Sequence, residues 1–427
     1  MKTPARWRYA MRIIIDVLWI GLGIAFVVYT NQLMQVTRFQ TSLGLGVSMA
    51  NIYLGVPILL SIVTVSLVSA TNIPGLVPAL VGHIRGSLGH TSVLSCTAMA
   101  NISGSSAAEA AAVGSVIIPA MKEKGYRPGT AASIVAASAT IGPIIPPSMT
   151  MIVYGSITGV SIGGLFIAGI IPGLLVACLL MLAIYFLSYL PQYEGLRATS
   201  KRSSWKQIVQ ATLKVWPALL APVVIMGGIL GGVFTATEAG VVACVYSLLV
   251  SKLWYKQLKW RELPSVFIDA AVTTAMVAGV LGMAGVLGWL LSYLNFNDTV
   301  LSALKGVTDS SLGMFAILAG IMLFLTMLLD GLAVIVVMIP TIVYVGTAFN
   351  IDPLQMGVVM VMITQIGGLT PPVALLLFIT SSIAKIPFSE GVRGVWPFLA
   401  VVVLVMALVM LIPALATWLP SVSMTTL

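Results

Sequence analysis

Long apolar segments, separated by short polar ones, set the pattern of this chain. The segments 13–34, 165–189, 266–290 and 394–418 are each at least as long as the roughly 20 residues that a helix needs to cross a bilayer. Glycines and prolines gather inside several of these segments, which is typical of helices broken at membrane depth. The pattern predicts an all-α polytopic membrane protein.

Composition supports this interpretation and excludes several functions. The 427 residues are 59% hydrophobic and only 8% charged, whereas soluble domains carry about 25% charged residues. The cysteines Cys96, Cys178 and Cys244 show no metal-ligand spacing, and no nucleophile–base pair or phosphate-binding loop is visible. We therefore predict neither an enzyme nor a protein with a cofactor. The apolar run after the basic N-terminus is interpreted as a retained helix, because it is too long for a cleaved signal peptide.

The Lys and Arg residues divide unevenly between alternate polar loops, which predicts a topology. With a cytoplasmic N-terminus only Arg38 and Lys305 lie outside, so 21 minus 2, or 19, of the Lys and Arg residues are cytoplasmic. This is a strong positive-inside bias, and it accounts for the net charge of +9 without nucleic acid. The C-terminus is then outside. The predicted crossings are 13–34, 52–70, 128–158, 165–189, 215–234, 239–255, 266–293, 355–384 and 394–419, with re-entrant hairpins at 92–121 and 313–346.

The two predicted hairpins resemble each other. In each, an acidic residue precedes a proline by ten residues: Glu109 and Pro119 in the first hairpin, Asp330 and Pro340 in the second. The two units lie roughly 220 residues apart and enter from opposite faces in the predicted topology. The chain is therefore predicted to contain an inverted repeat, an architecture of many secondary transporters.

Each hairpin is followed by a helix that is broken in its middle. A glycine precedes a Pro-Pro pair by four residues in both cases, at 142–147 and at 367–372. Proline removes a backbone donor and frees a carbonyl one turn earlier, and carbonyls with Ser or Thr hydroxyls suit Na⁺. The N-termini of half-helices carry partial positive charge and suit a carboxylate. The alternative is that these residues only kink packed helices.

The acids Glu109 and Asp330 are predicted to lie at membrane depth, at or near the hairpin tips. An ionisable group at membrane depth costs roughly 2.5–3.5 kcal/mol on insertion scales, so it usually has a role. One interpretation is that both acids help to bind a cation or form a switchable hydrogen bond. The other is that each caps the second helix of its hairpin, since each begins an apolar run.

Several of these motifs resemble the large membrane subunit of tripartite ATP-independent periplasmic (TRAP) transporters. The resemblance runs from about residue 80 to the C-terminus. Its motifs are Gly82–Gly86, Ser103–Gly114, Ile118–Met121, Gly142–Ser148, Phe234–Ala239 and Gly368–Pro372. In addition, residues 13–58 resemble the last helix and tail of the small membrane subunit, while Gly55–Ile58 resembles the opening of the large one. A shortened fusion of the two subunits is one interpretation.

The resemblance implies Na⁺-coupled uptake of a small organic carboxylate, such as a C4-dicarboxylate or sialic acid, across the bacterial inner membrane. It further implies that an elevator-type transport domain slides against a scaffold in the lipid, that a periplasmic substrate-binding protein delivers the solute, and that a small membrane subunit widens the scaffold. No cofactor beyond Na⁺ as coupling ion is implied. The implied division is 1–80 (N-terminal scaffold helices or small-subunit-like tail), 81–160 (first transport repeat), 161–312 (scaffold and connecting helices), 313–385 (second transport repeat) and 386–427 (C-terminal scaffold helix).

The resemblance also implies site residues. The first Na⁺ site maps near Ser103, Ser105, Gly142 and Pro143, and the second near Asp330, Gly331, Gly367 and Thr370. The substrate lies between the hairpin tips, near Ser105, Ser106, Pro146, Pro147 and Pro371. Two other functions stay open: a stand-alone ion-coupled carrier without a binding protein, and a non-transporting scaffold or sensor.

Overall fold

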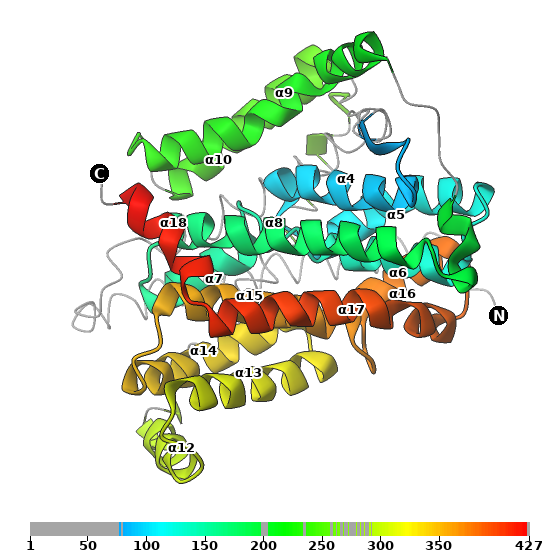
Figure 1. Cartoon of the computed structure of the whole chain (residues 1–427). Coiled ribbons are helices and arrows are strands. Elements are labelled where there is room, and N and C mark those ends of the chain that lie inside the picture. The colour runs from blue at the N-terminus through cyan, green and yellow to red at the C-terminus, as the bar shows by residue number, and fades with distance from the viewer. Residues whose placement is uncertain are drawn as a thin grey trace, which may run out of the picture. The chain divides into compact units, whose positions relative to one another are not determined.

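The computed structural model describes residues 81–197, 204–233, 236–256 and 293–424, together with single positions near these ranges. The chain divides into units 1–52 and 53–427, and every described residue belongs to the second. The described residues form helices and loops without a strand, which confirms the all-α class (Figure 1). The predicted crossings 13–34 and 52–70, and most of 266–293, lie outside the described residues.

The first repeat consists of two helices in a hairpin, followed by an interrupted helix. The hairpin joins α4 (Ser87–Ser103) to α5 (Ser106–Glu123) through Gly104 and Ser105, and it begins five residues before the predicted start at 92. The interrupted helix runs as α6 (Pro128–Ala139) and α7 (Met149–Thr158). The break therefore covers the predicted glycine and Pro-Pro pair.

The second repeat has the same order of elements. Its hairpin joins α13 (Ser311–Leu328) to α14 (Gly331–Ala348), and its interrupted helix runs as α15 (Pro353–Leu369) and α16 (Leu375–Ala384). The Pro-Pro bond in each interruption is cis. The sequence repeat is thus matched by a repeat in structure.

The two repeats interlock. The second helix of each hairpin packs against the first half of its own interrupted helix and against the second half of the other one: α5 against α6 and α16, and α14 against α15 and α7. The Tyr154 hydroxyl of α7 donates to the Pro353 carbonyl at the start of α15, at 3.0 Å. Lys122 at the end of α5 donates to the Ala384 carbonyl at the end of α16, also at 3.0 Å. The two repeats therefore share packing contacts and two hydrogen bonds.

Helix α6 lies at the centre of this arrangement. Every residue of α6 after Pro128 is buried. The sequence of α6 is mostly Gly, Ala, Ser and Thr, and such small residues let neighbouring backbones approach closely in membrane proteins. On α17 (Phe388–Leu411), Gly391 accepts a hydrogen bond from Ser133 at 2.9 Å, and Glu390 accepts one from the Gly129 amide at 3.2 Å.

The C-terminal segment differs from its prediction. The segment 394–419 is not one continuous helix, because α17 ends at Leu411 and a separate helix, α18 (Ala414–Met424), follows; α17 alone is long and apolar enough for the predicted crossing. Pro413 explains the break, since proline has no amide to donate and disfavours the helical conformation of the residue before it. Ile412 accordingly leaves the helical region, with φ −122° and ψ 85°. Helix α18 packs on α8 (Ile162–Leu187).

The described residues in the middle of the chain include three further α-helices. Helix α9 (Trp205–Leu230) begins ten residues before the predicted crossing at 215. The Gln207 side chain accepts from the Ser204 amide at 2.9 Å and so fixes this early start. Helix α10 (Ala236–Leu249) packs on α9, and α12 (Phe296–Lys305) contacts α14 through a hydrogen bond from Thr341 to Asn297.

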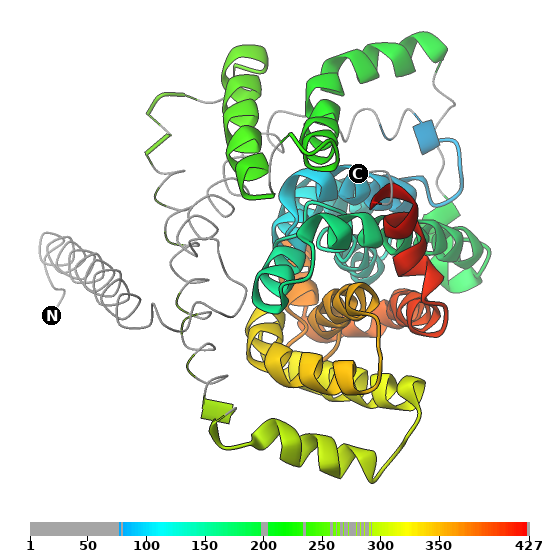
Figure 2. The ribbon, with the colours of Figure 1, turned by 90° about the vertical axis from the view of Figure 1, so that its left-hand side faces the viewer.

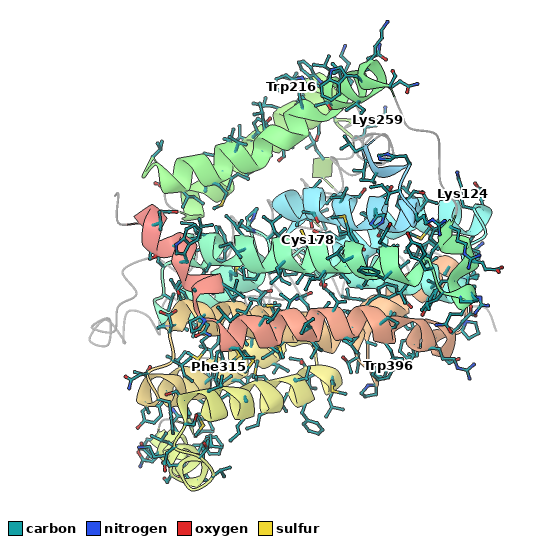
Figure 3. The ribbon with its side chains drawn as sticks, in the orientation of Figure 1. Lys124, Cys178, Trp216, Lys259, Phe315 and Trp396 are labelled. Atoms are coloured by element: carbon teal, nitrogen blue, oxygen red, sulfur yellow. The ribbon has the colours of Figure 1, made fainter. Side chains whose placement is uncertain are left out.

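Four of the described helices, α8, α13, α14 and α17, are long and apolar enough to cross a membrane. Helices α15 and α17 run side by side in Figure 1 and are seen end-on in Figure 2. Phe315 of α13 is 2% exposed, whereas Trp396 of α17 is 56% exposed and points away from the neighbouring helices (Figure 3). Helices α13 and α14 are each about 27 Å long, which is close to the thickness of the hydrocarbon core of a bilayer. Their length therefore does not distinguish a re-entrant hairpin from two full crossings, and the re-entrant hairpins and the external C-terminus stay predictions.

Candidate functional site

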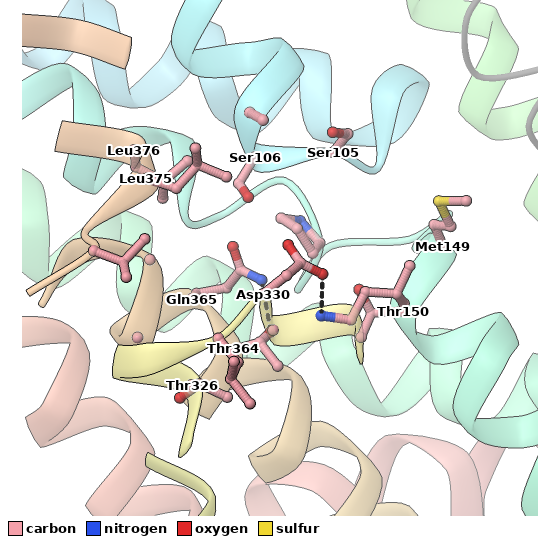
Figure 4. A pocket seen from close by; sticks show the side chains of 18 of the residues that line it. Ser105, Ser106, Met149, Thr150, Thr326, Asp330, Thr364, Gln365, Leu375 and Leu376 are labelled. Atoms are coloured by element: carbon pink, nitrogen blue, oxygen red, sulfur yellow. Dashed lines mark hydrogen bonds between the residues drawn. The ribbon is translucent and has the colours of Figure 1, made fainter. Parts of the chain in front are cut away.

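A cavity of about 430 Å³ lies where the two hairpin tips meet the two helix interruptions (Figure 4). Among the residues that the structure describes, its polar lining consists of five hydroxyl side chains, one amide and one carboxylate, with no Lys, Arg or His. The lining residues are Gly104, Ser105, Ser106, Ala107, Pro143, Met149, Thr150, Thr326, Leu329, Asp330, Gly331, Leu332, Thr364, Gln365, Gly367, Gly368, Val373, Leu375 and Leu376.

Four helices begin at this cavity. Ser106, Met149, Gly331 and Leu375 are the first residues of α5, α7, α14 and α16, and all four line it. The first turn of a helix has amides without a helical partner and carries partial positive charge, so it favours an anion. Four such ends meet here, that of α14 already capped by the Asp330 carboxylate, and the described lining residues include no cationic side chain. The remaining ends make the cavity suitable for a small anion.

Helix C-termini meet at the same place. Gly104 follows α4, Leu329 follows α13, and Gly367 and Gly368 lie in the last turn of α15; all of them line the cavity. The last turn of a helix presents carbonyl oxygens without a helical partner. Such oxygens favour hard cations. The cavity can therefore hold an anion and a cation close to each other.

The tip of the first hairpin is held against its own interruption by a glycine. Gly104 has φ +57°, and a Cβ atom at this position would overlap the Pro147 carbonyl oxygen. Any side chain at Gly104 would therefore be strained in its backbone and would push the tip away from the break. This close approach explains why the tip carries Gly104 between two serines.

The Glu109 carboxylate lies directly behind this tip. Ser105, not Glu109, caps α5, accepting from the Ala108 amide at 3.5 Å, so the capping interpretation of Glu109 is wrong. Glu109 instead lies in the first turn of α5, fully buried, and its Oε1 atom accepts a hydrogen bond from the Ser103 hydroxyl at 2.8 Å. A Cβ atom at Gly142 would lie 2.5 Å from the same Oε1 atom.

The tip of the second hairpin is built differently. Asp330 caps α14, and its Oδ1 atom accepts from the Leu332 and Ala333 amides at 3.0 and 3.2 Å, which confirms the capping interpretation for this acid. Asp330 is exposed and lines the cavity (Figure 4). The acid of the second hairpin therefore faces the cavity, whereas the acid of the first hairpin is buried behind the tip.

Glycines also set the approach of the second tip. A Cβ atom at Gly331 would lie 2.7 Å from the Thr364 Cβ atom, and one at Gly367 would lie 2.5 Å from the Thr326 hydroxyl. Thr370 follows α15, and its hydroxyl donates to the Ile366 carbonyl at 2.6 Å. Both interruptions thus use their predicted glycine as a contact point with the hairpin of the same repeat.

The predicted site residues fall into two groups. Those that line the cavity are Ser105, Ser106, Pro143, Asp330, Gly331 and Gly367. Those that do not line it are Ser103, Gly142, Pro146, Pro147, Thr370 and Pro371.

Four polar residues on α13, α15 and α7 were not predicted from the sequence. Thr326, Thr364, Gln365 and Thr150 line the cavity, and the Gln365 amide donates to the Thr364 hydroxyl at 2.9 Å. A signal for two of them was present, because Thr364 and Gln365 interrupt an apolar run directly before Gly367. Buried polar side chains in such a run usually have a role.

Comparison with known proteins agrees with this fold. The DctM family model, described as the tripartite ATP-independent periplasmic transporter, DctM component, matches residues 7–415. The match thus also covers most of the N-terminal stretch for which the small-subunit resemblance was noted. The matched residues include both repeats and end at the start of α18.

Three similar proteins are large permease subunits of TRAP transporters. The sialic acid TRAP transporter large permease protein SiaM of Vibrio cholerae is 35% identical over 342 residues, 80% of this chain and 79% of the relative. The C4-dicarboxylate protein DctM of Pseudomonas aeruginosa is 36% identical over 346 residues, covering 80% of this chain and 79% of the relative. The 2,3-diketo-L-gulonate TRAP transporter large permease protein YiaN of Escherichia coli is 34% identical over 336 residues, covering 79% of this chain and 78% of the relative.

The family match over most of the chain, and three relatives above 30% identity, decide the assignment. The family is one of transporter permeases rather than enzymes. Together with the membrane-competent helices, it also places the chain among multi-pass proteins of the inner membrane. The chain belongs to the DctM family, the large permease component of tripartite ATP-independent periplasmic transporters.

Proposed function

We propose that the chain carries out Na⁺-coupled uptake of a small organic carboxylate, which a periplasmic substrate-binding protein delivers. The observation that carries this proposal is the meeting of four helix N-termini on one cavity, whose lining has no Lys, Arg or His in the described part of the chain. Helix ends can hold an anion without a fixed positive charge, so the anion is also free to leave, as transport requires.

The class of substrate follows from the chemistry of the cavity. The Ser105, Ser106 and Thr150 hydroxyls and the second N–H of the Gln365 amide offer neutral hydrogen-bond donors, which suit a carboxylate and its neighbouring hydroxyl or keto groups. The Thr326 and Thr364 hydroxyls already donate to the Leu323 and Val361 carbonyls. The volume of about 430 Å³ lies within the range of small-molecule sites. Relatives are named for sialic acid, C4-dicarboxylates and 2,3-diketo-L-gulonate, which are all organic acids. We propose the same broad class for this chain.

Asp330 supports an obligatory coupling cation. A substrate carboxylate that enters the cavity comes close to this acid, and two unit negative charges 4 Å apart repel by about 4 kcal/mol at an effective dielectric constant of 20. A cation bound between carbonyl ends offsets this repulsion. Substrate affinity then depends on Na⁺, and the two predicted Na⁺ sites, one per repeat, are part of the proposal.

The packing supports movement of both repeats as one body, which is the elevator mechanism. Because α5 contacts α16 and α14 contacts α7, the hairpins and the interrupted helices interlock. Helix α17 packs on α6, α15 and α16, and α8 packs on α17. We therefore propose that α8 and α17 move with the repeats, which revises the predicted scaffold assignment of these two segments. A small membrane subunit would complete the scaffold.

Uptake by the purified protein tests this function. We expect proteoliposomes that contain the chain, its small membrane subunit and the matching binding protein to accumulate a labelled organic acid when Na⁺ is high outside, without ATP. Equal uptake in choline and sodium buffers, driven by a proton gradient, would contradict the coupling. Uptake without any binding protein would favour the stand-alone carrier, and no uptake with any organic acid would favour the non-transporting alternative.

A further inference from the structure

Glu109 is a buried carboxyl whose function is not explained by helix capping. The side chain is 0% exposed, and it lies in the first turn of α5, between the tip of the first hairpin and the break after α6. One carboxyl oxygen, Oε1, accepts from the Ser103 hydroxyl at 2.8 Å. The other, Oε2, has no hydrogen-bond partner in the part of the chain that the structure describes.

This environment does not satisfy a carboxylate. Buried charges in proteins are normally paired or bound to a metal ion, but no Lys, Arg or His contact with Glu109 occurs among the described residues. The carboxyl group is nevertheless held in place, because the Gly142 backbone lies against it so closely that even a methyl group would not fit. A fixed, unpaired and buried oxygen is a site that a small cation can complete.

We propose that the Glu109 carboxylate is the anionic ligand of the Na⁺ site in the first repeat, with the Ser103 hydroxyl as its neighbour. This inference rests on the proposed Na⁺ coupling and specifies one of its two sites. A single carboxylate carries one negative charge, which matches the charge of one Na⁺ ion.

The position of Glu109 links cation binding to the hairpin tip. The Ser103 hydroxyl donates to Glu109 and also accepts from the Ser105 amide, at 3.3 Å, so it connects the carboxylate to a residue that lines the cavity. A cation bound to Glu109, behind the tip, can therefore affect the position of Ser105 at the tip through Ser103. The two repeats are then unequal, since only Asp330 of the second repeat faces the substrate.

Glu109→Gln and Glu109→Asp separate charge from packing. Gln keeps the shape and can still accept from Ser103 but has no charge, whereas Asp keeps the charge on a shorter side chain. The measurements are the Na⁺ half-saturation of uptake and the Na⁺-dependent rise in melting temperature of the purified protein. Because removing one partner of a buried ion pair is strongly unfavourable, we expect half-saturation to rise at least about tenfold in Glu109→Gln and less in Glu109→Asp.

Glu123→Gln is the matched control, because Glu123 ends the same helix, is exposed and lies outside the cavity. We expect its Na⁺ dependence to equal that of the parent protein. If Glu109→Gln keeps the parent Na⁺ dependence in both measurements, Glu109 is not a cation ligand, and a shift of its pH profile instead would identify a proton carrier. A parent protein that needs no Na⁺ would refute the proposed function itself, so the two failures are distinguishable.

Discussion

Replacing Gly104 with alanine is expected to abolish uptake. Gly104 has φ +57°, which costs an alanine about 1–2 kcal/mol, and forcing a Cβ atom against packed backbone adds about 1–3 kcal/mol. The strain is relieved when the tip of the first hairpin moves away from the Pro147 carbonyl oxygen. Ser105 and Ser106 then leave their places in the cavity. Uptake and melting temperature are the quantities to measure.

Gly159→Ala is the control that separates the strain of a positive φ from the steric overlap with Pro147. Gly159 also follows a helix, α7, with φ +73°, but a Cβ atom there would have nothing within 4 Å. We expect Gly159→Ala to lower the melting temperature and to retain most uptake. If Gly104→Ala transports as well as Gly159→Ala, the contact between the tip and Pro147 is unimportant for transport.

Ser105→Ala and Thr370→Ala are each expected to lower the apparent Na⁺ affinity by roughly 5- to 150-fold. The reason is that each removes one oxygen from a small ligand shell, and a lost group of this kind in a buried site costs about 1–3 kcal/mol. Substrate affinity at saturating Na⁺ should recover, because coupling between two ligands is reciprocal. A Na⁺ titration of uptake by both variants is the measurement.

Two further variants control for local structure in this experiment. Ser105 also caps α5, so its loss costs up to about 2 kcal/mol of helix stability. Ser310→Ala removes a similar cap, from α13, at the end of that helix remote from the cavity, and should leave Na⁺ dependence unchanged. Thr370→Ser keeps the hydroxyl and should behave like the parent. Half-saturation values that match the parent in both alanine variants would refute the two-site model.

Much of the fold follows from local sequence signals. Glycine weakens a helix and a Pro-Pro pair has no amide to donate, so the interruptions after α6 and α15 were readable directly from residues 142–147 and 367–372. The hairpins were readable from their repetition. The break at Pro413 was missed although proline marks it, because the apolar pattern continues on both sides.

The site was only partly predictable, because it depends on contacts between residues far apart in the sequence. Hairpin tips and Pro-Pro pairs identify the region of the cavity, but not which side chains face it. Pro146, Pro147 and Pro371 do not line the cavity, whereas Thr326 and Gln365 on regular helices do. The two similar acids also differ in a way that only packing decides: Asp330 caps α14 and is exposed, while Glu109 is buried against Gly142.

Entry of radioactive Na⁺ with the substrate tests the central claim most directly. Proteoliposomes with equal Na⁺ on both sides, given binding protein loaded with an organic acid that the system transports, should take up labelled Na⁺ in a fixed ratio to the acid. Glu123→Gln should behave like the parent, and Gly104→Ala should show neither flux. Acid uptake without any additional entry of labelled Na⁺ would contradict Na⁺-coupled transport.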